Sequence, residues 1–252
     1  MLQDKTLAFI GIGVMGEAMI RGLLARDVVS ASSIIASDPV SPRLDAIAEQ
    51  YGVRSSRSNA DAVEAADLVV LSIKPQSLAR VLPEVKGRLR DDALLMSILA
   101  GVSIRTLAEG AGHRALVRAM PNTPARIGEG ISVWTETTEV TDQQRAGARE
   151  VLAALGQEIH VDNEEYLDMA TALSGSGPGY VFLFLEAMID AGVHMGFPRR
   201  VAEQLVLQTV RGSVEYTEQS GLHPAQLRNQ VTSPGGTTAA ALYHMEKGGL
   251  RT

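Results

Sequence analysis

The sequence predicts an α/β protein, with a doubly wound, mostly parallel sheet in residues 1–161 and an all-helical domain in residues 162–252. Three observations support this prediction. The chain opens on an apolar run that ends in a glycine-rich loop, further apolar runs alternate with amphipathic stretches, and the alternation stops after Asp162. Strands that are separated by helices pair in parallel through right-handed crossovers, and such crossovers build a doubly wound sheet.

The first elements are a strand over residues 6–10, a glycine-rich loop, and a helix from Glu17 to Arg26. The loop reads Gly11-Ile12-Gly13-Val14-Met15-Gly16, and this glycine spacing between a strand and a helix is typical of a Rossmann dinucleotide-binding domain. The first glycine permits a tight turn, the second lets the backbone approach a pyrophosphate, and the third allows close packing of helix and strand. The helix dipole then faces the phosphates. We expect Gly11, Gly13, Val14, Met15 and Gly16 to bind the cofactor.

The second strand, residues 33–37, ends at Asp38. This position lies roughly 20 residues beyond the glycines, where Rossmann domains place the residue that reads the adenosine ribose. A plain turn at Asp38-Pro39 is the alternative. A carboxylate here accepts hydrogen bonds from both ribose hydroxyls of NADH but repels the 2′-phosphate of NADPH, which Ser37 and Arg43 can partly compensate. On this physical ground the prediction leans toward NADH.

Later strands are expected over residues 68–73, 93–98, 115–120, 130–134 and 158–161, with a capping box at residues 141–144. Open α/β sheets bind ligands at the carboxyl ends of their strands. The loops there supply the other candidates for cofactor binding, which are Asn59, Ile73, Lys74, Pro75, Ala100, Gly101 and Asn122. Lys74 either approaches a ribose hydroxyl or a phosphate or is a solvated lysine. Asn122 lies between two prolines, which suits either a tight turn or a contact on the nicotinamide side.

Composition argues against several classes of function. The 252 residues carry a net charge of −6 with a pI near 5.4, which argues against a nucleic-acid partner because such proteins present a basic face. The chain has no cysteine, so disulfides and thiolate catalysis are excluded. Its five histidines show no ligand spacing, and no metal site is expected. The first residues lack the pattern of a secretory signal, which predicts a cytoplasmic protein.

Helical periodicity marks the second domain, over residues 164–173, 180–195, 198–219, 224–230 and 234–247. Its most apolar segment, residues 180–196, carries Glu186, Asp190 and His194. This segment is too short and too polar to span a bilayer, which predicts a buried helix and no membrane partner. Two of the helices hold more apolar residues than a domain of about 90 residues needs for its own core. We expect the excess to pack against a second copy of the chain in a homodimer.

The segment Val231-Thr232-Ser233-Pro234-Gly235-Gly236-Thr237-Thr238 opens the last helix with small residues and hydroxyls. We expect Ser233 to be the N-cap and Pro234 to take the first helical position. The amides of Gly235, Gly236 and Thr237 would then lack partners within the helix and face a small anion such as a carboxylate. An ordinary capped helix is the alternative interpretation.

Together these motifs resemble those of the pyrroline-5-carboxylate reductases, over almost the whole chain. The motifs that carry the resemblance are the glycine loop at residues 11–16, Ile73-Lys74-Pro75-Gln76, Met120-Pro121-Asn122-Thr123-Pro124, Ala172-Leu173-Ser174-Gly175-Ser176-Gly177-Pro178-Gly179-Tyr180, and residues 231–238. The last two are highly specific for that family. The resemblance implies reduction of (S)-1-pyrroline-5-carboxylate to L-proline, the last step of proline biosynthesis, with hydride from NADPH or NADH. It also implies a helical dimerisation domain and, in many members, pentamers of dimers.

Site roles follow from the motifs and from the resemblance together. The Ser233 hydroxyl and the amides of Gly235, Gly236, Thr237 and Thr238 are expected to hold the substrate carboxylate. The resemblance assigns to the Thr238 hydroxyl a hydrogen bond to the ring nitrogen, so Thr238 and Ser233 are the catalytic candidates. Ser176 and its neighbours either shape the other wall of the substrate pocket or form a glycine-rich entry to a helix. The resemblance implies a preference for NADPH, whereas Asp38 predicts a preference for NADH.

Two other classes of function remain as alternatives. A β-hydroxyacid dehydrogenase or imine reductase of similar layout would act on a different small carboxylate. Such enzymes generally depend on a lysine in the region between the domains, and residues 167–179 contain none. A non-catalytic NAD(P)-binding protein is the second alternative, and the hydroxyls of Ser233, Thr237 and Thr238 argue against it.

Overall fold

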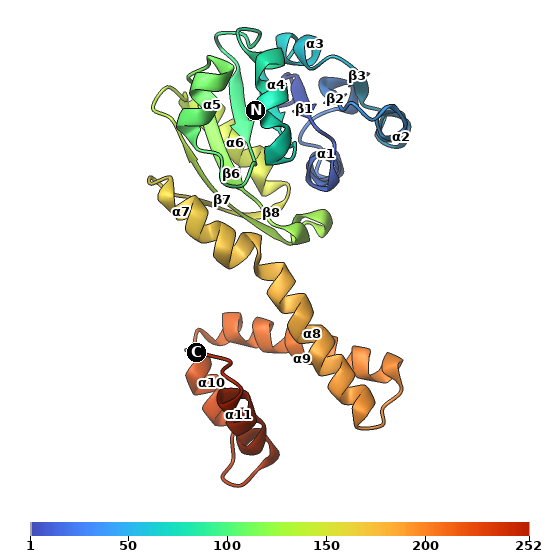
Figure 1. The fold of residues 1–252 in the computed structure, drawn as a ribbon, viewed down its shortest axis with the longest axis vertical. Helices are drawn as coiled ribbons and strands as arrows, with labels where there is room; N and C mark the ends of the chain where they lie inside the picture. Colours follow the sequence, from blue (N-terminus) through green and yellow to red (C-terminus); the bar gives the residue numbers. More distant parts are fainter. Residues whose placement is uncertain (1, 252) are drawn as a thin grey trace. The chain divides into compact units, whose positions relative to one another are not determined.

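The computed structural model describes residues 2–251. The chain divides into two compact units, Met1–Tyr180 and Val181–Thr252. The first unit is built on an eight-stranded sheet of order β3-β2-β1-β4-β5-β6-β7-β8 (Figure 1). Its strands are β1 Leu7–Ile10, β2 Ile34–Ser37, β3 Arg54–Ser56, β4 Leu68–Leu71, β5 Leu94–Ser97, β6 Leu116–Met120, β7 Gly130–Glu136 and β8 Gly156–His160.

All neighbouring strands pair in parallel except β6 and β7, which are antiparallel. The first six strands follow the order of a Rossmann domain. This confirms the predicted doubly wound, mostly parallel sheet. Strand β3 was not predicted, because its three residues are polar and mostly exposed and so show no apolar run.

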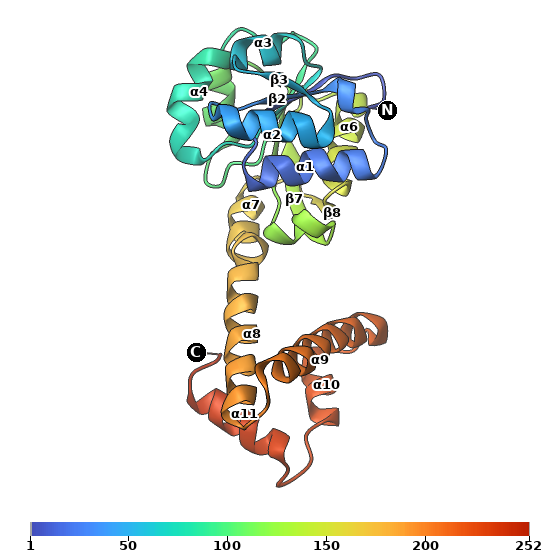
Figure 2. The ribbon, with the colours of Figure 1, turned by 90° about the vertical axis from the view of Figure 1, so that its right-hand side faces the viewer.

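The helices of the first unit lie on both faces of the sheet, as Figures 1 and 2 show. They are α1 Val14–Ala25, α2 Ser41–Tyr51, α3 Asn59–Glu64, α4 Leu78–Val85, α5 Ile104–Ala111, α6 Asp142–Ala153 and α7 Glu165–Ala170. Side chains of α1, α2 and α6 pack on one face of the sheet, and side chains of α3, α4 and α5 pack on the other. The predicted capping box is present, because the Thr141 hydroxyl accepts from the Gln144 amide and the Gln144 side chain accepts from the Thr141 amide.

A buried arginine fastens α7 to the sheet. The side chain of Arg118 in β6 is 5% exposed and donates to Glu164 and to Asp168, each at 2.7 Å. Glu164 also accepts from the Ile104 amide at the start of α5, at 2.7 Å. Because Arg118 is buried, removing both carboxylates would leave its charge uncompensated, so these contacts hold α7 against the sheet. The first compact unit therefore includes α7 and extends to Tyr180, whereas the predicted division after residue 161 lies close to the end of β8.

The second unit holds the rest of α8 Gly177–His194, with α9 Arg199–Ser220, α10 Pro224–Gln230 and α11 Thr237–Lys247. Few of its described residues are buried in the single chain. Gly192 is buried in α8, and Ala202 and Val206 are buried in α9. Large apolar side chains in α8 are exposed, including Phe182 at 58% and Leu183 at 67%. The expectation of a buried helix is therefore wrong for the isolated chain.

Apolar surface of this extent marks a contact with another surface. By length and composition, the helical run Glu165–His194 is also apolar enough to cross a membrane, with a mean hydropathy of 1.2. However, it carries four acidic residues, which are Glu165, Asp168, Glu186 and Asp190, and Asp168 forms an ion pair with Arg118. An acidic residue at a membrane centre costs roughly 2.5–3.5 kcal/mol. We therefore assign the exposed apolar surface to a subunit interface.

Candidate cofactor and substrate sites

The glycine loop joins β1 to α1 and matches the geometry that was expected of each glycine. Gly11 has a φ of +88°, and a Cβ there would lie 2.7 Å from Ile73 Cγ2. A Cβ on Gly16 would lie 2.5 Å from the Gly11 carbonyl oxygen, so only glycine allows this approach. In the described part of the chain, nothing lies within 4 Å of a Cβ placed on Gly13. The backbone at Gly13 therefore borders open space, as a pyrophosphate requires.

Helix α1 begins at Val14, with Gly13 as its N-cap and no side chain capping it. The start is three residues earlier than predicted, so Gly16 lies in the first turn and Val14 and Met15 supply free amides. Two hydrogen bonds fix the loop to neighbouring strands. Gly11 N donates to the Ser37 carbonyl at 2.8 Å, and Ser72 Oγ donates to the Gly11 carbonyl at 2.6 Å. The open helix mouth thus lies where β1 and β4 diverge, which is the ligand site of a doubly wound sheet.

Asp38 closes a turn and also borders this site. Its Oδ2 accepts from the Ile12 amide at 3.1 Å, and its Oδ1 accepts from the Val40 amide at 2.9 Å. Arg43 donates through Nε to the Ile12 carbonyl and forms an ion pair with Glu17 at 3.1 Å. Each Asp38 oxygen retains a second lone pair. Both interpretations of Asp38, the turn and the ribose contact, are therefore compatible with its geometry.

A pocket of about 390 Å³ adjoins the glycine loop. It brings together seven predicted residues, which are Gly11, Gly13, Ser37, Asp38, Asn59, Ile73 and Lys74. Ser37 Oγ donates to Asn59 Oδ1 at 2.7 Å, and Asn59 Nδ2 donates to Glu84 at 2.7 Å, so Asn59 is held rigidly. Arg57 and Arg80 also line the pocket and were not predicted, because they belong to no motif and Arg57 follows the unpredicted strand β3. Three cations around an open helix mouth favour a ligand with phosphates.

Seven predicted cofactor residues lie outside the lining of this pocket. Val14, Met15 and Gly16 open helix α1, and the other four lie in neighbouring loops. Pro75 opens the short 3₁₀ turn Pro75–Ser77, and Ala100 and Gly101 lie in the loop between β5 and α5. Asn122 follows β6, and its side chain bonds two backbone groups. Nδ2 donates to the Ser174 carbonyl at 3.2 Å, and Oδ1 accepts from the Ile131 amide at 3.0 Å. A cofactor contact by these residues, as by those that line the pocket, stays a prediction.

In the second unit, α11 does not begin as expected. Gly236 is the N-cap and Thr237 the first helical residue, so the predicted cap at Ser233 is wrong. Ser233 to Gly236 form a turn instead, in which Gly236 N donates to the Ser233 carbonyl at 3.1 Å and Gly235 has a φ of +70°. Proline in second place and glycine in third place favour such a turn over a first helical turn. The Gly236 amide is therefore already bonded.

The mouth of α11 nevertheless presents free polar groups. The amides of Thr237 and Thr238 belong to the first helical turn and have no acceptor within the helix. Within residues 2–251, the hydroxyls of Ser233, Thr237 and Thr238 make no hydrogen bond, whereas Thr232 Oγ1 donates to the Arg228 carbonyl at 2.6 Å. A small carboxylate suits this mouth, with its donors now supplied by Thr237 and Thr238.

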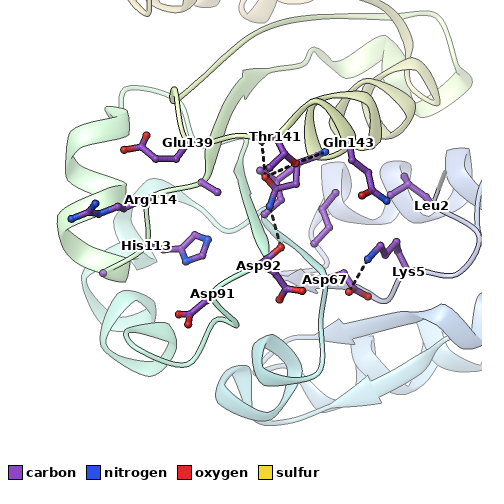
Figure 3. Close-up of a pocket in the computed structure, with 16 residues that line it drawn as sticks. Leu2, Lys5, Asp67, Asp91, Asp92, His113, Arg114, Glu139, Thr141 and Gln143 are labelled. Carbon is purple, nitrogen blue, oxygen red and sulfur yellow. Dashed lines mark hydrogen bonds and ion pairs between the residues drawn. The ribbon is translucent and has the colours of Figure 1, made fainter.

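A larger pocket, of about 630 Å³, lies at the opposite ends of the strands (Figure 3). It reaches Leu68 and Leu94, the first residues of β4 and β5, so it faces the amino ends of the strands. Several of its charges are paired, as in the ion pair of Lys5 with Asp67 at 3.3 Å. The hydrogen bond from Arg90 lowers the pKa of the Asp92 carboxyl. Its acidic lining and its place at the amino ends of the strands distinguish it from the pocket beside the glycine loop.

A Rossmann domain with an open glycine loop, followed by a helical domain with a helix mouth of free amides and hydroxyls, indicates an NAD(P)-dependent oxidoreductase of the two-domain class. Comparison with known proteins narrows this class. Residues 164–252 match the family model described as pyrroline-5-carboxylate reductase dimerisation, and residues 6–101 match the one described as NADP oxidoreductase, coenzyme F420-dependent.

Full-length relatives agree. The chain is 41% identical over 246 residues to the pyrroline-5-carboxylate reductase of Synechocystis sp., covering 98% of this chain and 91% of the relative. It is 41% identical over 250 residues to that of Pseudomonas aeruginosa, covering 99% and 91%. The crystal structure of Plasmodium falciparum pyrroline carboxylate reductase with NADP bound superimposes with a TM-score of 0.91 at 32% identity, covering 99% and 92%. The chain belongs to the pyrroline-5-carboxylate reductase family.

Membership of this family confirms the predicted fold class and oxidoreductase activity. The match to a dimerisation domain covers the helices that expose apolar side chains in the single chain. The helical region is therefore a dimerisation domain, and the protein forms oligomers.

Proposed function

We propose that this chain reduces (S)-1-pyrroline-5-carboxylate to L-proline with hydride from NAD(P)H, as the last step of proline biosynthesis. The single observation that carries this proposal is the mouth of α11, where the hydroxyls of Ser233, Thr237 and Thr238 bond to none of the described residues, in a chain that also holds an open glycine loop. A carboxylate-binding mouth selects a small acid, and the dinucleotide supplies the reducing power.

The residues of the first unit fit a dinucleotide. The open backbone at Gly13 and the amides of Val14 and Met15 bind the pyrophosphate, and Lys74 and Arg57 lie where they can pair with phosphate oxygens. When bound, the reduced nicotinamide supplies a hydride to the imine carbon of the substrate. The chain itself contributes placement, which is the main requirement of hydride transfer.

The second unit holds the substrate in this proposal. The amides of Thr237 and Thr238 and the hydroxyl of Ser233 bind the carboxylate and so fix the orientation of the ring. Gly235 and Gly236 shape the preceding turn and bring no side chain into the mouth. Ser176 is the further residue that we assign to substrate binding. Catalysis then requires the cofactor and this helix mouth to meet in the working enzyme.

The Thr238 hydroxyl hydrogen-bonds to the ring nitrogen. Addition of hydride to the carbon of the C=N bond places the electron pair of the π bond on nitrogen, and a proton must arrive there to give the amine. A threonine hydroxyl is too weak an acid to be the source of this proton. The proton comes from water, or the substrate enters already as the iminium. Thr238 therefore orients and polarises the nitrogen without giving up its own proton.

Steady-state oxidation of the reduced cofactor, followed by nicotinamide absorbance with pyrroline-5-carboxylate as substrate, tests the function. We expect turnover with this imine and none with open-chain 2-oxo acids, because activation at nitrogen suffices for an imine and residues 167–179 offer no lysine for a ketone. Turnover of a hydroxy or oxo acid in preference to the imine would favour the dehydrogenase alternative. Absence of all turnover with intact cofactor binding would favour a non-catalytic protein.

Replacing Asp38 by serine is expected to shift the cofactor preference toward NADPH. The carboxylate repels a 2′-phosphate, while Arg57, Arg43 and Ser37 remain nearby to bind one. Because each charge contact contributes about 1.5–3 kcal/mol, the ratio of kcat/KM values for NADPH and NADH should rise on the order of tenfold or more. Kinetics with both cofactors for wild type and Asp38→Asn, which removes the charge but keeps an acceptor, provide the control. An unchanged ratio would limit Asp38 to its role in the turn.

For the assembly, we propose a homodimer through the helical domain and a pentamer of dimers as the higher state. We also propose a cytoplasmic location, since the relatives are biosynthetic enzymes and the chain has no cysteine that could form a disulfide.

A further inference from the structure

Asn122 and Pro178 lie in different motifs and meet at one carbonyl group. In a continuous helix, the carbonyl of residue 174 would accept the N–H of residue 178. Residue 178 is proline, which has no N–H, so the Ser174 carbonyl loses this helical partner. The side chain of Asn122 supplies the missing donor, with Nδ2 3.2 Å from the Ser174 oxygen.

The other end of the Asn122 amide is also fixed. Its Oδ1 accepts from the Ile131 amide at 3.0 Å, so the orientation of the side chain is set at both ends. Asn122 itself follows β6, at the carboxyl edge of the sheet where the cofactor loops lie. One side chain thus connects this edge to the segment that precedes the second unit.

The segment that Asn122 contacts is irregular. Thr171–Gly175 form a π-helical turn, in which Ser176 N donates to the Thr171 carbonyl at 2.8 Å. A Cβ on Gly175 would lie 2.6 Å from Met120 Cε, so the turn approaches the end of β6 closely. π-helical turns are rare and are frequently found at functional sites.

We propose that Asn122 is a positioning residue that satisfies the Ser174 carbonyl left open by Pro178, and so holds Ser176 in place for the substrate. The proposal rests on the proposed function, in which Ser176 lines the substrate site. In this proposal the Asn122 side chain binds the Ser174 carbonyl and does not contact the nicotinamide. The two motifs are then coupled, because Pro178 leaves the Ser174 carbonyl without a helical donor and Asn122 supplies one.

A double-mutant cycle between positions 122 and 178 tests this coupling in the full-length enzyme. Asn122→Asp keeps an acceptor for the Ile131 amide but turns a carboxylate toward the Ser174 carbonyl. We expect the KM for pyrroline-5-carboxylate to rise about fivefold, the equivalent of one hydrogen bond, with the Kd for NADPH unchanged. Pro178→Ala restores an N–H for Ser174, so in this background the same substitution should raise KM less than twofold.

Three results would overturn the proposal. The first is a rise in the Kd for NADPH with no relief by Pro178→Ala, which would place Asn122 on the cofactor. The second is a fall in melting temperature without any change in KM, which would show a purely structural role. The third is strict additivity of the two substitutions in both KM and melting temperature. Should Asn122→Asp fail to fold, Asn122→Ser removes the donor without adding charge.

The same cycle separates this proposal from the proposed function. If the wild-type enzyme does not reduce pyrroline-5-carboxylate, the proposed function fails. Melting temperatures still test whether the hydrogen bond couples positions 122 and 178, because this coupling does not depend on which substrate the enzyme reduces.

Discussion

Replacing Thr238 by alanine should lower kcat on the order of 100-fold, because loss of one well-placed donor in an active site has about this effect. Thr238 lies in the first turn of α11, and its hydroxyl makes no hydrogen bond within residues 2–251, so it is available to the substrate. The Kd for NADPH should stay unchanged, because the proposed cofactor site is the glycine loop, which lies in the other unit. Steady-state kinetics and a fluorescence titration with NADPH measure the two quantities.

Thr238→Ser is the matched control for this prediction, since it keeps the hydroxyl and loses only a methyl group. We expect it to retain most of the activity. Turnover of the alanine variant at the wild-type level would show that the Thr238 hydroxyl takes no part in the reaction. Equal losses in the alanine and serine variants would show that packing, and not the hydroxyl, is what matters at this position.

Alanine substitutions at Gly13 and Gly16 should separate cofactor binding from stability. A Cβ on Gly13 meets no described atom within 4 Å, so Gly13→Ala should fold normally and instead occupy the space of the pyrophosphate. We expect its Kd for the cofactor to rise about tenfold or more, because the pyrophosphate needs close approach of the backbone. Titration with NADPH measures this loss, and thermal unfolding checks that the fold is intact.

Gly16→Ala, in contrast, places a Cβ 2.5 Å from the Gly11 carbonyl oxygen. Backbone must move to relieve this contact, and such overpacking costs about 1–3 kcal/mol. The melting temperature should therefore fall by roughly 3–10 °C. A Gly13→Ala variant that loses as much stability as Gly16→Ala, or that binds the cofactor as wild type does, would contradict the geometry assigned to the loop.

Much of the fold could be predicted because its signals are local. The strand that ends at Ile10, the glycine spacing and the apolar runs of β4, β5 and β6 are each readable from a few consecutive residues. The same holds for the capping box at Thr141. Strand β3 could not be predicted, since its residues Arg54, Ser55 and Ser56 gain their strand conformation by pairing with β2, a contact between distant parts of the chain.

The site was only partly predictable, for a similar reason. Ser233 and Pro234 have the composition of a helix start, but the glycine at position 235 favours a turn that delays the helix to Thr237. Arg57 and Arg80 line the pocket beside the glycine loop because distant loops and helices pack together there, and such packing cannot be read from the local sequence. The apolar residues of α8 suggested a buried helix, but they are exposed in the single chain. Their burial would require a second subunit, which a single sequence does not describe.

The most direct test of the account is a crystal structure of the enzyme with oxidised cofactor and L-proline bound together. We predict that the carboxylate of proline lies on the amides of Thr237 and Thr238, with its ring nitrogen within hydrogen-bonding distance of the Thr238 hydroxyl and C4 of the nicotinamide facing the ring. A proline bound away from the mouth of α11, or a nicotinamide that points away from the proline ring, would contradict the account.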